Sequence, residues 1–163
     1  IISVIGTGPV TVPKDPIRIA NCSGFFGDRP SAALEMVNGG PIDVLSGDWL
    51  AELTMLILSR IKSKNPQYGY ARTFVTQMND VIETCLEKGI KVVSNAGGLN
   101  PKACAEAIQE IAEKRGLSPS IAYIDGDDLM TRLPELINTE SLFPFEAEQK
   151  LGDASEYVTA NAY

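Results

Sequence analysis

Histidine is absent from this sequence of 163 residues. The chain therefore cannot assemble a Ser-His-Asp or Cys-His catalytic triad from its own residues. A histidine-based zinc site and an iron site of two histidines and one carboxylate are excluded for the same reason. Any metal held by these residues would need oxygen ligands, or ligands supplied from outside the sequence.

Long apolar runs, cysteines and positive charge are also scarce. No apolar run reaches the roughly 18 residues of a membrane-spanning helix, and "IISVIGTGPVTVP" has no basic residues ahead of it, unlike a signal peptide. The three cysteines have no short pairing motif, which is typical of a reducing compartment, so we expect a cytoplasmic protein. The net charge of −7 argues against nucleic acid and anionic membranes as partners.

The composition is that of a globular protein, with 44% apolar and 21% charged residues. We expect one α/β domain over residues 1–138, followed over 139–163 by a loop or lid. The sequence lacks an initiator Met and stops within "YVTANAY". We therefore expect it to continue into a further C-terminal part.

Short β-branched runs alternate with helical patterns along the chain. Strands are expected at about 17–21, 43–46, 91–95 and 121–125, and this alternation predicts an open, mostly parallel sheet with helices on both faces. The four strands are expected to be neighbours. The fold would be Rossmann-like, but no dinucleotide fingerprint and no P-loop follows any strand.

Small or polar residues follow each expected strand. The four segments are Asn21–Gly24, Ser46–Asp48, Asn95–Gly98 and Asp125–Asp128. Tight turns and helix caps would explain any one of them. Because the carboxyl ends of parallel strands share one edge, the four together favour a binding cleft there.

The segment "KVVSNAGGLNPKACAEAI" predicts a strand, a glycine loop and a helix. Asn100 is suited to the N-cap of that helix and Pro101 to its first position. One glycine would suffice for the turn, so we expect Gly97 or Gly98 to let a ligand approach the backbone.

Glu52 follows Asp48 by four residues, so the two carboxylates would share one face of a helix. That helix is apolar nearly all round, which predicts burial. The pair could be acid–base groups or ligands of a hard metal ion. Alternatively, Asp48 caps the helix and Glu52 pairs with Arg29 or Arg72.

A second acidic cluster contains Asp125, Asp127 and Asp128. It would suit Mg²⁺ or Ca²⁺ but is too short for an EF-hand, and Asp127 could instead cap a helix. Cys22 stands at a strand end, yet no histidine is present to activate it as a nucleophile. The other two cysteines lie on expected helices and are expected in the core.

Several segments, in this order, resemble the acyclic terpene utilisation protein A (AtuA) family. They are "IRIANCSGFFGDRPSAALEMV", "IDVLSGDWLAELTM", "GYARTFV", "GIKVVSNAGGLNPKACAEAI", "DGDDL" and "YVTANAY". Besides Asp48 and Glu52, the family motifs fall on Asn21, Ser23, Gly24, Asp28, Arg29, Gly47, Asn95, Gly97, Gly98, Asn100, Gly126 and Asp127. We expect Asp48 and Glu52 to be catalytic and the other twelve to bind substrate.

The resemblance implies the N-terminal domain of a longer catabolic enzyme. Its substrates would be terpenoid or branched-chain carboxylates or their CoA thioesters, and one branch of the family is associated with metal-dependent oxygenation. The cofactor would be a divalent metal or iron with ligands partly outside this chain. The alternatives are a metal-free lyase or hydratase acting on acyl-CoA, and a non-catalytic domain that binds a partner subunit or the missing C-terminal part.

Overall fold

The computed structural model describes residues 2–4, 15–139 and 151–162. The chain forms two compact units, Ile1–Ile124 and Asp125–Tyr163, and each is described by itself. The loop or lid expected over residues 139–163 stays a prediction, since its residues 140–150 lie outside the described ranges. Within the described ranges, no helix has the length and apolar character needed to cross a membrane.

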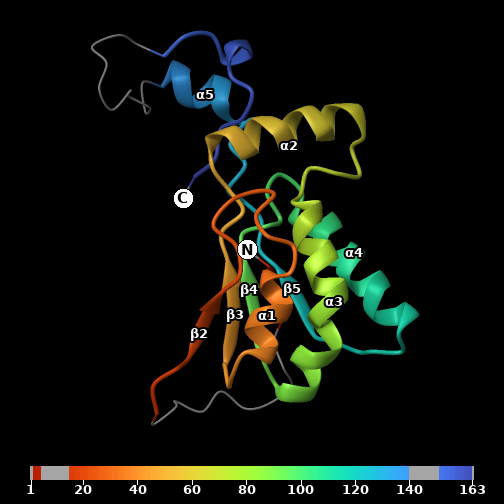
Figure 1. The fold of residues 1–163 in the computed structure, drawn as a ribbon. Helices are drawn as coiled ribbons and strands as arrows, with labels where there is room; N and C mark the ends of the chain where they lie inside the picture. The colour runs from red at the N-terminus through yellow and green to blue at the C-terminus, as the bar shows by residue number, and fades with distance from the viewer. Residues whose placement is uncertain (1, 5–14, 140–150, 163) are drawn as a thin grey trace. The chain divides into compact units, whose positions relative to one another are not determined.

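The first unit is built on a five-stranded sheet (Figure 1). Its strands are β1 (Ile2–Val4), β2 (Ile19–Asn21), β3 (Val44–Gly47), β4 (Lys91–Ser94) and β5 (Ile121–Tyr123). The order across the sheet is β2-β3-β4-β1-β5, with β2, β3 and β4 parallel. The α/β fold class, with a small open and mostly parallel sheet, is confirmed.

The position of β5 corrects the expectation that all four strands would be neighbours. β5 runs in the same direction as β4, but β1 lies between them and is antiparallel to both. The sequence could not reveal this, because the pattern of residues 1–5 suits either a strand or an ordered tail. Only pairing with two distant strands places β1 inside the sheet.

Helices α1 (Ala32–Asn38), α3 (Arg72–Lys88) and α4 (Pro101–Lys114) form one layer against the sheet (Figure 1). α1 contacts α3, and α3 contacts α4. Along β4, Val92 is buried while Val93, which points to the opposite face, is 36% exposed. These three helices therefore cover the face of the sheet on which Val92 is buried.

Two helix boundaries are set by local residue types, and the one expected at Asn100 is confirmed. α3 ends at Gly89, which has a left-handed φ of 66° and donates its N–H to the carbonyl oxygens of Cys85 and Leu86. α4 begins after Asn100, whose side chain accepts the N–H of Ala103 as an N-cap. Both signals are local, so the sequence contains them.

Asp43, next to the start of β3, forms an ion pair with Arg18 at the edge of the sheet where the parallel strands begin. Its carboxylate accepts two hydrogen bonds from the Arg18 side chain, from Nε at 2.9 Å and from Nη2 at 2.7 Å. It accepts a third from the Arg18 backbone N–H at 2.8 Å. These hydrogen bonds, the side-chain bonds foremost, lower the pKa of Asp43 to about 2. The stabilisation is therefore complete above the unfolded pKa of about 4 and lost as the pH falls toward 2.

We expect Asp43→Asn to lower the thermal midpoint at neutral pH, and the difference from wild type to disappear as the pH falls from about 4 toward 2. Thermal unfolding followed by circular dichroism across this range measures it. Because the pair is exposed, the effect should also shrink in high salt. A difference that persists unchanged at the lowest pH would contradict this assignment.

Candidate functional site at the carboxyl ends of the strands

The loops that follow β2, β3 and β4 are tied to one another. The Asp48 N–H donates to the carbonyl oxygen of Ser23 at 2.9 Å, which joins the first two loops. The Trp49 N–H donates to Oδ1 of Asn95 at 2.9 Å, which joins the second and third. Asn21, the last residue of β2, is exposed and in register with Ser46 of β3. The structure thus brings together three of the four loops expected at this edge.

Asp48 and Asn95 form the central polar pair of this edge. Nδ2 of Asn95 donates to Oδ1 of Asp48 at 2.6 Å, and the Leu50 N–H donates to the same oxygen at 3.0 Å. Asp48 is exposed, and its Oδ2 has no hydrogen-bond partner within the described part of the chain. The result is an oriented carboxylate with one oxygen available to a ligand.

The loop around Asp48 is held in place by the only tryptophan in the sequence. The Trp49 ring is 1% exposed and meets Phe74 edge to face, with ring centroids 4.9 Å apart. A Cβ at Gly47 would lie 2.5 Å from the Trp49 ring, so only glycine fits there without movement. Sequence reasoning missed Trp49, although a lone Trp beside a candidate carboxylate was a signal for such an anchor.

Glu52 does not share a helix face with Asp48. Helix α2 (Glu52–Lys64) begins at Glu52 with Ala51 as its N-cap, so Asp48 precedes the helix. α2 is also not a buried helix, because Glu52 is exposed and Leu53 is 68% exposed. The expectation of burial is wrong because an apolar composition does not show which residues find packing partners.

The structural alternative for these carboxylates is also incorrect. Arg29 pairs with Glu35 at 2.8 Å, and the Arg72 guanidinium lies over the Tyr68 ring, 5.2 Å from its centroid. Glu52 has no ion pair within the ranges that the structure describes. Its catalytic role remains a prediction.

Asp28 organises the loop after β2. Its carboxylate accepts the Gly24 N–H at 2.9 Å and the Arg29 N–H at 2.7 Å, and these bonds lower the pKa of Asp28. Ser23 is buried, and its Oγ donates to the carbonyl oxygen of Phe25 at 3.0 Å. These polar groups therefore have structural uses within the loop, and a role in binding is not needed to explain them.

The Gly-Gly loop after β4 packs against its own chain. A Cβ at Gly97 would lie 2.7 Å from Cβ of Pro101, and one at Gly98 would lie 2.5 Å from Cδ1 of Leu58. Besides capping α4, Asn100 donates to the carbonyl oxygens of Pro66 and Tyr68. Close packing within the protein thus explains both glycines, and an approach by a ligand remains a prediction.

Comparison with known protein families gives one match. The sequence matches the family described as "Acyclic terpene utilisation family protein AtuA" over residues 17–163. The chain belongs to the AtuA family. No curated protein and no solved structure matches it.

In this AtuA-family chain, Cys22 is unsuited to be a nucleophile. It is 3% exposed, and burial raises the pKa of its thiol to about 11. The thiol is therefore protonated at neutral pH and shielded from solvent. Cys85 and Cys104 are also buried, which confirms their place in the core.

The second unit contains the fourth expected loop. Oδ2 of Asp127 accepts a hydrogen bond from Nδ2 of Asn161 at 3.1 Å. The backbone carbonyl oxygen of Asp127 accepts one from the Ala162 N–H at 2.8 Å. Asp127 does not cap helix α5 (Leu133–Asn138), whose N-cap is Arg132. No group of three or more Asp, Glu, Cys or His residues suited to a metal occurs in the described ranges, these aspartates included. Gly126 has a φ of 107°, in the left-handed region that favours glycine.

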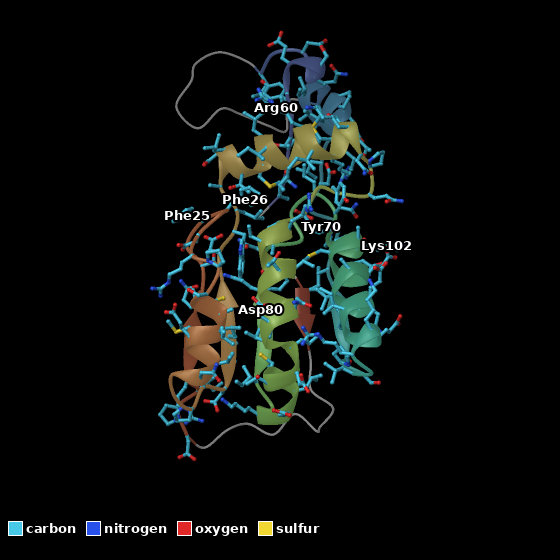
Figure 2. The ribbon with its side chains drawn as sticks, turned by 45° about the vertical axis from the view of Figure 1, so that its right-hand side comes forward. Phe25, Phe26, Arg60, Tyr70, Asp80 and Lys102 are labelled. Atoms are coloured by element: carbon cyan, nitrogen blue, oxygen red, sulfur yellow. The ribbon has the colours of Figure 1, made fainter. Side chains whose placement is uncertain are left out.

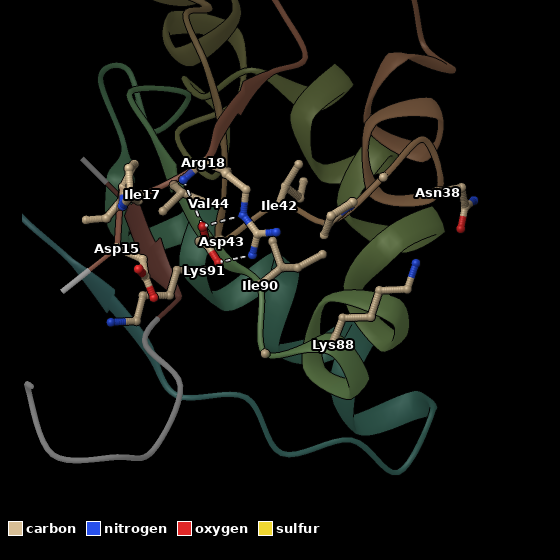
Figure 3. Close-up of a pocket in the computed structure, with 14 residues that line it drawn as sticks. Asp15, Ile17, Arg18, Asn38, Ile42, Asp43, Val44, Lys88, Ile90 and Lys91 are labelled. Carbon is tan, nitrogen blue, oxygen red and sulfur yellow. Dashed lines mark hydrogen bonds and ion pairs between the residues drawn. The ribbon is translucent and has the colours of Figure 1, made fainter. Parts of the chain in front are cut away.

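A hollow of about 1190 Å³ lies at the opposite edge of the sheet, near the amino ends of β2, β3 and β4 (Figure 3). Sequence reasoning did not predict it. Arg18 and Asp43 in its wall neutralise each other, and Lys88 donates to the carbonyl oxygen of Val37 at 2.7 Å. The C-terminal ends of α1 and α3 border the hollow, and the partial negative charge of their last carbonyl groups would repel an anion. These features do not indicate a ligand.

Proposed function

We propose that this AtuA-family chain is the N-terminal domain of a catabolic enzyme acting on terpenoid or branched-chain carboxylates or their CoA thioesters. Asp48 would be its acid–base group. The observation that supports this proposal is the 2.6 Å hydrogen bond from Asn95, which orients one oxygen of Asp48 and leaves the other free. A general acid or base must present such an oxygen to the substrate.

The described residues do not fit the metal centre that the family resemblance implies. A site for a hard metal ion needs several converging oxygen or nitrogen ligands. At this edge Oδ1 of Asn95 is already used by the Trp49 N–H, and no three metal-ligating side chains cluster in the described ranges. Proton transfer at Asp48 needs no such set of metal ligands. Lyase or hydratase chemistry is therefore the form of the proposal that this geometry supports best.

In that chemistry, Oδ2 of Asp48 would take a proton from the substrate or deliver one to it. Asn95 would keep the carboxylate from rotating, and Trp49 would keep the loop from moving. A positioned acid or base of this kind contributes about 10²–10⁴-fold to the rate. Glu52, exposed at the start of α2, remains a proposed second group.

The test is turnover by the full-length protein on a panel of branched, unsaturated carboxylates and their CoA thioesters. Mass spectrometry follows the products, in parallel reactions with a chelator and without oxygen. We expect addition or loss of water that survives both treatments. Products that require oxygen or metal would replace the hydratase proposal with oxygenation, and no consumption of any acid or thioester would reject the catalytic proposal.

The second candidate is a non-catalytic binding or assembly domain. It is favoured by the face of the sheet opposite α1, α3 and α4, where Ile19 is 67% exposed. Its partner would be a C-terminal part of a longer protein or another subunit. The turnover panel separates the two candidates, because only an enzyme would convert the acid or thioester into a product.

We also propose that the protein acts in the cytoplasm. The support is that all three cysteines are free and buried, as is usual where thiols stay reduced.

A further inference from the structure

Phe25 is an exposed aromatic residue beside the Asp48 loop. Its side chain is 59% exposed, whereas the adjacent Phe26 packs partly against the core. The connection to Asp48 is short: Ser23 accepts the Asp48 N–H through its carbonyl oxygen and donates its Oγ to the carbonyl oxygen of Phe25. Two hydrogen bonds through Ser23 therefore connect the backbone of Phe25 to the backbone of Asp48.

Hydrogen bonds hold the loop in this form. The Asp28 carboxylate accepts the N–H groups of Gly24 and Arg29, on either side of Phe25, and the Asp28 N–H donates to the Phe25 carbonyl oxygen at 3.2 Å. The loop is thus closed by polar contacts, and the Phe25 ring takes no part in them. A ring presented to solvent by an ordered loop loses little conformational entropy when a ligand covers it.

A second apolar side chain lies at the same end of the unit. Leu53 is 68% exposed in the first turn of α2, five residues after Asp48. Figure 2 shows Phe25 and Phe26 at the end of the sheet where α2 begins. Exposed apolar residues that occur singly are ordinary. Here two of them occur in segments next to Asp48: Phe25 in the loop that is hydrogen-bonded to the Asp48 backbone, and Leu53 five residues further along the chain.

We propose that Phe25, together with Leu53, contacts the apolar chain of the substrate whose reacting end lies at Asp48. Phe25 would then be a specificity-determining residue for chain length and branching. This inference rests on the proposed function, because it assumes a carboxylate or thioester with a hydrocarbon chain at that site. Polar groups at Asp48 would orient the substrate, and the two apolar side chains would remove its chain from water.

The test is calorimetric binding of straight and methyl-branched carboxylic acids of increasing length to the full-length protein. We expect the affinity of wild type to rise by about fourfold per methylene group, as burial of a methylene predicts. In Phe25→Ala this rise should be largely lost, and in Phe25→Leu largely kept. The matched control is Ile17→Ala, which truncates a side chain 55% exposed at the opposite edge of the sheet.

Circular dichroism confirms that each variant is folded before binding is compared. A dependence on chain length that survives in Phe25→Ala, or that is equally lost in Ile17→Ala, would overturn the inference. Binding by wild type that does not vary with chain length would also overturn it, but would leave the proposed function standing. No binding of any acid, with no turnover on the panel, would reject both.

Discussion

Asp48→Asn is expected to lower turnover by the full-length protein about 10²–10⁴-fold. The substitution keeps the side-chain shape and retains Oδ1, the oxygen that accepts the N–H groups of Asn95 and Leu50. What it removes is the ability to exchange a proton at Oδ2. Because Asp48 is exposed, we expect the thermal midpoint to change little, and a melting curve with a turnover assay on the same sample measures both.

The matched control for Asp48→Asn is Asp80→Asn, another exposed aspartate, which lies on α3 (Figure 2). It should leave both turnover and melting unchanged. Glu52→Gln should also fold normally, because Glu52 is exposed and has no ion pair within the described ranges. The loss of turnover that the sequence leads us to expect for Glu52→Gln is a separate prediction. Near-normal turnover by folded Asp48→Asn would reject the acid–base role of Asp48.

Gly98→Ala is expected to destabilise the protein by about 2–4 kcal/mol. Two costs add: a left-handed backbone conformation, and a methyl group forced into a filled space. The φ of Gly98 is +50°, and the new Cβ would lie 2.5 Å from Cδ1 of Leu58 and 2.9 Å from the carbonyl oxygen of Gly69. The second contact is with backbone, which cannot move aside as a side chain can.

Gly116→Ala is the matched control, because it separates these two costs. Gly116 has a φ of +68° and nothing within 4 Å of the added Cβ, so only the conformational cost of about 1 kcal/mol applies. Urea unfolding of both variants measures the difference between them. Equal losses of stability would show that packing against Leu58 and Gly69 contributes nothing.

The same variants address the expectation that a ligand approaches the Gly-Gly loop. The structure directs an added methyl group at Gly98 into the protein itself, so poorer folding is the expected effect. Calorimetric binding expressed per folded molecule tests the ligand role independently. Unchanged affinity would leave the loop as a close-packed turn and would limit the site to the region around Asp48.

Many structural features of this protein are set by residues close together in the chain and could be predicted from the sequence. The cap formed by Asn100 and the buried cysteines follow from residue type and periodicity. The parallel strands β2, β3 and β4, and the meeting of their loops near Asp48, follow from the alternation of strands and helices. Membership of the AtuA family was likewise visible in the order of the motifs.

Other features were decided by contacts between residues far apart in the chain. β1 became an inner strand by pairing with both β4 and β5, and the helix layer formed on one face because α3 packs against α1 and α4. Glu52 is exposed because α2 starts there and buries other residues, and Gly98 must be glycine because Leu58 and Gly69 fill the space beside it. Residue type shows what a segment can form, but burial and partners depend on which segments meet, and only the tertiary structure contains that information.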